Sequence, residues 1–277
     1  AAELYREHNI DLASEPVEIG VCSQHNNGGL KGNIWWESDL KHLFPVGEVN
    51  GSHGVHRPGG SALNSGQVGS SRAAEFISKR YYNPAPDNTI FMAVSGDEIS
   101  AVLGLASGWL LAGKSMRNKK AITCIQQRMS RAGSIIRRSK DAAKATAEAL
   151  VLNGEITNRL GASTTRELAS CFRIYDNCLA HLIYLEAIKK YIKMNGRSRG
   201  SYLITDGIES ENQDLTSAGL NFSLCMYDRE VEENILEIRY RQGRIKSHLE
   251  KVREIPAQNL WFEKVWKEYR EDSYIQS

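Results

Sequence analysis

The sequence changes character abruptly at Ser61, and this change constrains the fold more than any other feature. Both Gly-Gly pairs, Gly28-Gly29 and Gly59-Gly60, lie before this point. Apolar, β-branched segments at 16–22 and 42–49 are bounded by Asn and Gly, which predicts two strands. Because glycine allows tight bends and close backbone approach, each strand is expected to lead into a glycine bend.

Beyond Ser61 the sequence predicts helices. One helix is expected to run to about Arg80, with a buried side formed by Ala62, Val68, Ala73, Phe76 and Ile77. The segment 81–88 holds two prolines and indicates a linker. Further helices are predicted over 97–112, over 116–152 as a pair or as one long helix, and over 164–195.

The segment 164–195 carries the clearest helical pattern. Thr164 and Glu167 have the spacing of a capping box, and Gly196 is suited to end the helix. Its two cysteines belong to an apolar stripe and are expected to be core residues, not reactive thiols. The stripe consists of Leu168, Cys171, Tyr175, Cys178, Leu182, Leu185, Ile188 and Ile192.

The pattern changes again from Gly200. Two strands are predicted at 222–228 and 235–240, joined by an acidic turn. A last helix is expected to dock through Leu260, Trp261, Val265, Trp266 and Tyr269. These patterns predict an α+β fold that is mostly helical, with units at 1–82, 95–200 and 201–277.

Composition favours a soluble globular protein, since 41% of the 277 residues are hydrophobic and 25% are charged. The five cysteines include no CxxC pair, so neither a metal site nor a disulfide framework is predicted, and a reducing cytoplasm fits best. The apolar stretch Ala101 to Gly113 is shorter than a membrane span and is expected to be a buried helix. The chain lacks an initiator Met and a signal peptide, and we expect it to begin within an element of the fold.

Charge is segregated along the chain. Ten Lys or Arg and one acid lie between Lys114 and Lys144, and nine acids and one base lie between Asp206 and Glu237. The favoured interpretation is that these segments face water or each other. The alternative, a nucleic-acid surface, is disfavoured because no aromatic side chains interrupt the basic run.

Residues 53–69 combine His, Arg and Gly just before a predicted helix start. Free N–H groups at a helix start favour electron-rich ligand atoms, and Arg57 can clamp a carboxylate or phosphate through two parallel bonds. Glu48, at a predicted strand end, can accept hydrogen bonds from ribose or ribitol hydroxyls. Upstream, His25 is followed by the other Gly-Gly bend. Together these features predict a shared site at the carboxyl edge of a sheet.

The segment from Gly47 to Leu63 carries a motif of defined spacing. It reproduces the pattern G-E-x-x-G-x-H-G-x-x-R-x-G-x-x-x-L at every named position. The segment 43–77 resembles the C-terminal portion of the flavin-binding domain in the succinate dehydrogenase/fumarate reductase flavoprotein family, to which L-aspartate oxidase belongs. The resemblance is strong over about 35 residues and weak beyond residue 95. It implies that 1–82 is the C-terminal part of an FAD-binding α/β domain, followed by a helical domain and a C-terminal hairpin and helix.

The resemblance also implies site residues. FAD would exchange hydride at N5 with a small dicarboxylate, and Glu48 would bind the FAD ribitol. The backbone of Ala62 and Leu63 would meet the pyrimidine edge of the flavin. Arg57 and, less firmly matched, His25 would hold the substrate carboxylates. His53 matches the family histidine that supports this loop.

The family's GxGxxG turn and its capping domain have no counterpart in this sequence. The resemblance therefore implies an incomplete FAD site that an N-terminal FAD-binding and capping portion would complete. We expect an FAD-dependent oxidoreductase when complete, inactive as this fragment alone, with no direct membrane span. The alternative is a non-catalytic assembly module that docks an electron-transfer subunit.

Overall fold

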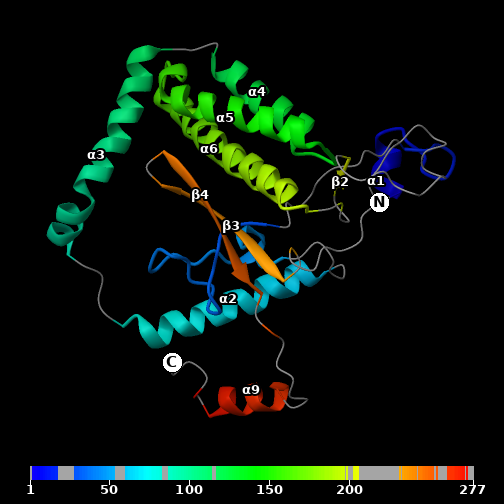
Figure 1. The fold of residues 1–277 in the computed structure, drawn as a ribbon, viewed down its shortest axis with the longest axis vertical. Coiled ribbons are helices and arrows are strands. Elements are labelled where there is room, and N and C mark those ends of the chain that lie inside the picture. The colour runs from blue at the N-terminus through cyan, green and yellow to red at the C-terminus, as the bar shows by residue number, and fades with distance from the viewer. Residues whose placement is uncertain are drawn as a thin grey trace.

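The fold contains a bundle of three helices, a long helix that packs on this bundle at one end, and a two-stranded hairpin (Figure 1). The hairpin lies between the bundle and a loop-rich segment near the N-terminus. The computed structural model describes residues 2–17, 28–53, 60–82, 87–113, 117–196, 198, 202–205, 231, 233–241, 243–252, 254, 261–271 and 273. The helices are α1 (Ala2–Glu7), the 3-10 turn η1 (Gly47–Val49), α2 (Ser61–Arg80), α3 (Asn88–Ala112), α4 (Arg117–Ala132), α5 (Ser139–Arg159), α6 (Thr165–Lys193) and α9 (Trp261–Arg270). The strands are β1 (Ile136–Arg137), β2 (Leu203–Ile204), β3 (Asn234–Arg241) and β4 (Arg244–Lys251).

Helices α4, α5 and α6 form the bundle that holds most of the described core. The predicted stripe of α6 points into it: Cys171, Cys178, Leu182 and Leu185 are each 0% exposed. Burial raises the pKa of the Cys178 thiol to about 11, so this thiol stays protonated and inert. The prediction that the α6 cysteines are core residues is confirmed.

The start of α6 differs from the predicted capping box. Thr164 is the residue before the helix, as expected, but its side chain makes no capping hydrogen bond. The Glu167 carboxylate instead accepts from the backbone N–H of Ser163 at 2.7 Å. The glutamate therefore satisfies a donor one residue earlier than the motif places it.

Helix α3 is longer than predicted and is largely exposed. It begins at Asn88 because the Asp87 side chain accepts from the Ile90 N–H and caps it. Only Trp109 is buried: its indole donates to Thr157 O and meets the Phe172 ring edge-on. The prediction of a buried helix over Ala101 to Gly113 is wrong, because the described chain packs only the C-terminal end of α3, against α6.

By length and composition α3 could also cross a membrane. Its two ends, however, lead into parts of the chain that the hairpin holds together. Helix α6 packs on β3, and Glu237 and Arg239 of β3 form ion pairs with Lys31 and Asp39. The two ends of α3 thus connect parts of the chain that contact each other through the hairpin.

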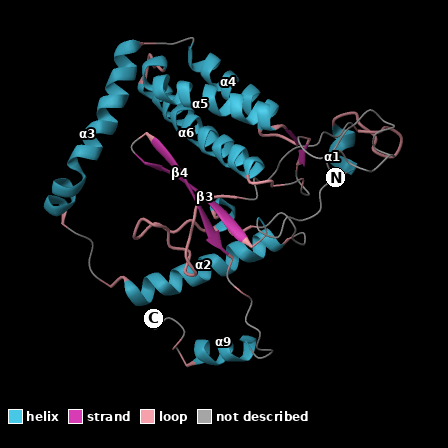
Figure 2. Cartoon of the chain, viewed as in Figure 1, coloured by secondary structure: helices cyan, strands magenta, loops and turns pink. Residues whose placement is uncertain are grey.

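The hairpin pairs a predicted strand, β3, with a strand that the sequence did not predict, β4. The strand prediction at 235–240 is confirmed, but β3 pairs antiparallel with β4 through a turn at Gly243, where φ is 74° (Figure 2). The sequence 222–228 lies outside the described residues. Asn153 of α5 donates to the Tyr240 hydroxyl, and Lys31 lies 2.6 Å from Glu237. The hairpin thus joins the bundle to the segment 28–53.

The predicted strand at 42–49 is wrong. Residues 47–49 form the turn η1 instead, because Gly47 has φ of 75° and Pro45 offers no N–H for a ladder. The predicted strand at 16–22 falls largely outside the described residues. Helix α2 has the predicted bounds, and Ala73 is buried, but Val68 and Ile77 are 47% and 40% exposed. Its covered side meets aromatic rings from 33–45, among them Trp35, which stacks on Phe76.

The last helix, α9, forms where the sequence predicts it but does not dock. Val265, Trp266 and Tyr269 are 41%, 52% and 45% exposed. The aromatic rings instead stack along the helix, with 5.7 Å between the Trp266 and Tyr269 centroids. The expected docking is therefore wrong for the described part of this face.

Candidate functional site

The candidate site is built around the loop that follows η1. Asn50 is 4% exposed and organises this loop through both ends of its amide. Its Nδ2 donates to Pro45 O at 3.0 Å, and its Oδ1 accepts from Ser52 N at 2.8 Å. Because both amide atoms are satisfied, the turn before the site is fixed from within.

His53 joins this loop to the start of α2. Its side chain is buried, with Nδ1 3.2 Å from Asn50 O and Nε2 3.4 Å from Ala62 O. Both partners are carbonyl oxygens, so whichever ring nitrogen carries the proton donates to one of them. His53 therefore holds the first turn of α2 against the turn after η1. This is the contact through which it would support the loop.

The start of α2 presents backbone donors that have no acceptor within the helix. Gly60 precedes the helix in the left-handed conformation, with φ of 79°, and Asn64 N makes the first intrahelical bond, to Gly60 O. The N–H groups of 61–63 therefore have no acceptor within the helix. The Ser61 hydroxyl is buried and has no hydrogen-bond partner among the described residues. These donors favour an electron-rich ligand edge at this helix start.

Glu48 lies in η1 beside α2. Its side chain is exposed, and the two elements approach closely because glycines face each other: a Cβ on Gly66 would lie 3.4 Å from Gly47 Cα. An exposed carboxylate in this turn can accept hydrogen bonds from hydroxyls. Glu48 thus lies in a turn that packs beside α2, the helix whose first turn holds Ala62 and Leu63.

The first Gly-Gly bend also reaches this place. Leu30 N donates to Val49 O at 2.8 Å, and Gly51 N donates to Leu30 O at 2.9 Å. A Cβ on Gly29 would lie 2.3 Å from Val49 O, so only glycine fits. The structure thus brings the bend after His25 to the turn that carries Glu48. His25 and Arg57 themselves lie outside the described residues.

Sequence reasoning missed Asn50 and the packing of Trp36 under α2. Asn50 carried one usable signal, since Asn before Gly is a turn former. Gly69 carried none: a Cβ there would lie 2.5 Å from the Trp36 ring, a contact between segments more than thirty residues apart. Such long-range contacts cannot be predicted from local pattern.

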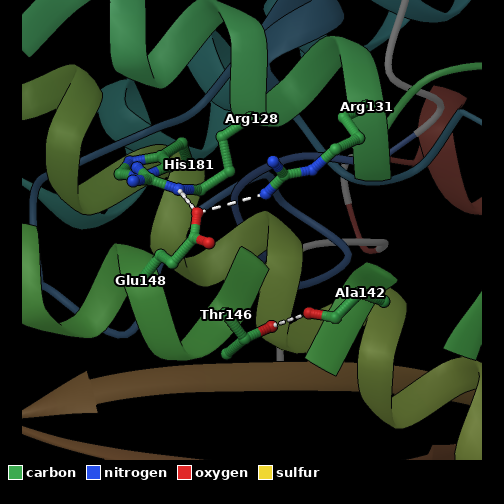
Figure 3. Close-up of polar contacts among 6 residues, drawn as sticks. All are labelled: Arg128, Arg131, Ala142, Thr146, Glu148 and His181. Atoms are coloured by element: carbon green, nitrogen blue, oxygen red, sulfur yellow. Dashed lines mark hydrogen bonds and ion pairs between the residues drawn. The ribbon is translucent and has the colours of Figure 1, made fainter. Parts of the chain in front are cut away.

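A second polar cluster lies inside the bundle (Figure 3). Glu148 accepts from Arg128 at 3.2 Å and from Arg131 at 3.1 Å, and Arg128 also lies 3.2 Å from His181 Nε2. His181 Nδ1 lies 3.2 Å from Asn177 O. Arg128 has only donors, so Nε2 is the acceptor and Nδ1 carries the proton. Each member is partnered within the protein, which indicates a structural role.

This cluster predicts that acid weakens the bundle. Burial and the nearby Arg128 charge lower the pKa of His181, so the unfolded chain takes up this proton first as pH falls. The stability that neutral His181 contributes is complete above about pH 6.5 and declines below it, by at most about 1.4 kcal/mol per pH unit. Glu148 acts in the same direction at lower pH. Burial raises its pKa, but the bonds from Arg128 and Arg131 outweigh burial and lower it.

Urea unfolding between pH 5 and 7.5 measures this effect. His181→Gln, which keeps an acceptor for Arg128, should flatten the profile over that range. The control His248→Gln removes an exposed histidine of β4 and should leave the profile unchanged. An equally steep profile in His181→Gln would show that another group governs the acid sensitivity.

Comparison with known proteins shows which proteins this chain resembles. No family profile matches the chain. One component of the CoM/CoB fumarate reductase of Methanothermobacter marburgensis is 43% identical over 65 residues, which cover 23% of this chain and 12% of that protein. An uncharacterized FAD-dependent oxidoreductase of Methanocaldococcus jannaschii is 37% identical over 79 residues, which cover 27% of this chain and 15% of that protein.

Two solved structures have a fold similar to that of this chain. A mutant FrdA chain of E. coli quinol fumarate reductase superimposes with a TM-score of 0.68 at 18% identity, covering 94% of this chain and 42% of that one. The chain matches part of a fumarate reductase-type flavoprotein. A quinol-fumarate reductase structure with menaquinol molecules gives a TM-score of 0.59 at 19% identity, covering 93% of this chain. This chain thus spans less than half the length of these proteins, and its mostly helical α+β fold is similar to theirs.

Proposed function

We propose that this flavoprotein segment contributes one part of the FAD site and the substrate-carboxylate clamp of a fumarate reductase-type oxidoreductase. One observation carries the proposal. His53 fixes the start of α2, whose first amides have no acceptor within the helix, beside the turn that carries Glu48. The names of the matched relatives, an FAD-dependent oxidoreductase and a component of a fumarate reductase, support the same assignment.

The described residues suit a flavin. The Ala62 and Leu63 amides would donate to the pyrimidine edge, and the 75% exposure of Leu63 leaves room for a planar ring there. Glu48 would accept from the ribitol hydroxyls. Positive helix-start amides favour negative charge on the ring they contact. When bound, FAD would supply the two-electron chemistry that no side chain of this segment can provide.

Arg57 and His25 are proposed to hold the dicarboxylate. Arg57 is three residues from Gly60, so covalent geometry keeps its Cα within about 11 Å of that of Gly60. His25 stands at the same separation before Gly28, and Gly29 contacts Val49. A guanidinium fork suits a carboxylate, which supports Arg57 as the clamp in this proposal.

The proposed site needs a second portion of protein. The FAD diphosphate site and the capping domain would come from an N-terminal portion, and an electron-transfer subunit would exchange electrons with the flavin. We also propose that the protein is cytoplasmic. The chain is proposed to divide into structural units near residues 82 and 200. The competing assignment, a non-catalytic assembly module, draws support from the exposed apolar side chains of α3, such as Leu103 and Leu111.

We expect the isolated 277-residue chain to bind FAD weakly or not at all, because half of the contacts are missing. Fluorescence titration measures this. Adding the N-terminal portion as a separate chain should restore flavin binding and fumarate-dependent turnover. Tight stoichiometric FAD binding by the isolated chain would contradict the incomplete site. Association without restored redox activity would favour the assembly module.

Glu48→Ala in the complete protein should mainly weaken flavin retention, by about tenfold, because charge-assisted hydrogen bonds to hydroxyls are lost. Flavin content after gel filtration reports the effect. Glu75→Ala removes a carboxylate from the middle of α2 and serves as the control. A normal flavin content in Glu48→Ala would remove Glu48 from the site.

A further inference from the structure

A pocket of about 500 Å³ lies between the start of α4 and the end of α5, on the helical bundle and apart from the proposed flavin site. We call it the α4–α5 pocket. Its volume lies within the usual range for small-molecule sites, about 300–1,000 Å³. It is lined by Arg117, Lys120 and Ala121 of α4 and by Glu155, Asn158 and Arg159 of α5.

The walls of the α4–α5 pocket are held at a fixed separation. The Asn118 amide donates to Gly161 O at 2.8 Å and accepts from Gly161 N at 3.1 Å, which ties the start of α4 to the residues that follow α5. Ala121 is buried, and its small side chain leaves space between the longer polar ones. The pocket is therefore a feature of the packed bundle.

The pocket is basic. Three cations and one carboxylate line it, and that carboxylate, Glu155, already pairs with Arg159. The first turn of α4 contains no acid, although Arg117, Lys119 and Lys120 gather there. Cations at the positive end of a helix are unfavourable, and a bound anion would relieve this.

We propose that the α4–α5 pocket binds a small organic phosphate. Arg117 carries a planar guanidinium that matches phosphate oxygens, and Arg159 has N–H donors beyond the one that pairs with Glu155. Lys120 adds a point charge, and the Asn158 amide can donate as well. The volume exceeds what a single phosphate group fills, which leaves room for an organic portion. The proposal does not depend on the flavin site, because none of its residues belongs to η1 or α2.

The experiment titrates the full 277-residue chain with pyrophosphate by calorimetry at constant ionic strength. Arg117→Gln/Lys120→Gln should weaken binding at least tenfold. The matched control, Lys119→Gln/Lys140→Gln, removes two charges of the same basic run that do not line the pocket, and it should stay within twofold of wild type. Adipate, a dicarboxylate, should bind more weakly than pyrophosphate.

Thermal unfolding adds a readout that a loss of folding could not imitate. In chloride, Arg117→Gln/Lys120→Gln should unfold in one cooperative transition, as wild type does, which shows that it folds. Saturating pyrophosphate should raise the stability of wild type and raise that of the double variant much less. Absence of saturable pyrophosphate binding, equal weakening in both double variants, or tighter binding of adipate would each overturn the proposal.

Discussion

Arg57→Lys in the complete protein should lower kcat/KM for the dicarboxylate by about 100-fold or more while FAD stays bound. A lysine keeps the charge but cannot make two parallel hydrogen bonds, so the carboxylate loses its fixed orientation relative to the flavin. Steady-state kinetics measures the loss, and the visible flavin spectrum reports retention of the cofactor.

The control is Arg72→Lys. Arg72 lies on α2, where its guanidinium stacks 4.5 Å from the Trp35 ring and its Nε donates to Ile34 O. This change tests what an arginine-to-lysine substitution on α2, the helix that follows Arg57 in the sequence, does to the fold alone. If Arg57→Lys turned over substrate as well as Arg72→Lys does, the carboxylate clamp would have to lie elsewhere.

Gly29→Ala should disrupt the candidate site, whereas Gly28→Ala should be tolerated. A Cβ at Gly29 would lie 2.3 Å from Val49 O and 2.9 Å from the Asn50 carbonyl carbon, both backbone atoms that cannot move aside. At Gly28 nothing lies within 4 Å. Overpacking of this kind costs about 1–3 kcal/mol, and here it would separate Leu30 from the turn after η1.

Two measurements test the glycine pair. Denaturant unfolding should show the loss of stability for Gly29→Ala only, and the complete protein carrying this change should lose flavin on gel filtration. Equal behaviour of the two variants would mean that the segment 28–30 does not pack against Val49 as described.

Local pattern predicted the long helices because their periodicity repeats over many residues. The stripe of α6 places Cys171 and Leu182 in the core, and helix α2 begins and ends where the spacing changes. The Gly-Gly pair before Ser61 likewise predicted where α2 starts. That Glu48 and this helix start share a site stays a prediction. Both features depend on residues close in sequence, whose geometry is set by helical spacing and glycine bends.

Other outcomes depended on contacts between distant segments. An apolar helix over 97–112 is predicted from sequence, but whether α3 is buried depends on which partners reach it, and in the described chain only its end meets α6. From sequence, the strand at 235–240 could pair with the segment before it or the segment after it. The turn at Gly243 allows the following segment, β4, to pair with it. The apolar pattern of 42–49 predicts a strand, but Gly47 adopts a left-handed φ and the chain forms a turn there.

The sequence by itself determined where the helices lie and that a carboxylate turn, a glycine bend and a helix start follow one another. Only the tertiary structure decided that His53 bridges Asn50 and Ala62, and that Gly29 reaches Val49. Side-chain periodicity is a local property of the chain. A buried hydrogen bond between loops, by contrast, exists only once packing has brought its donor and acceptor out of water.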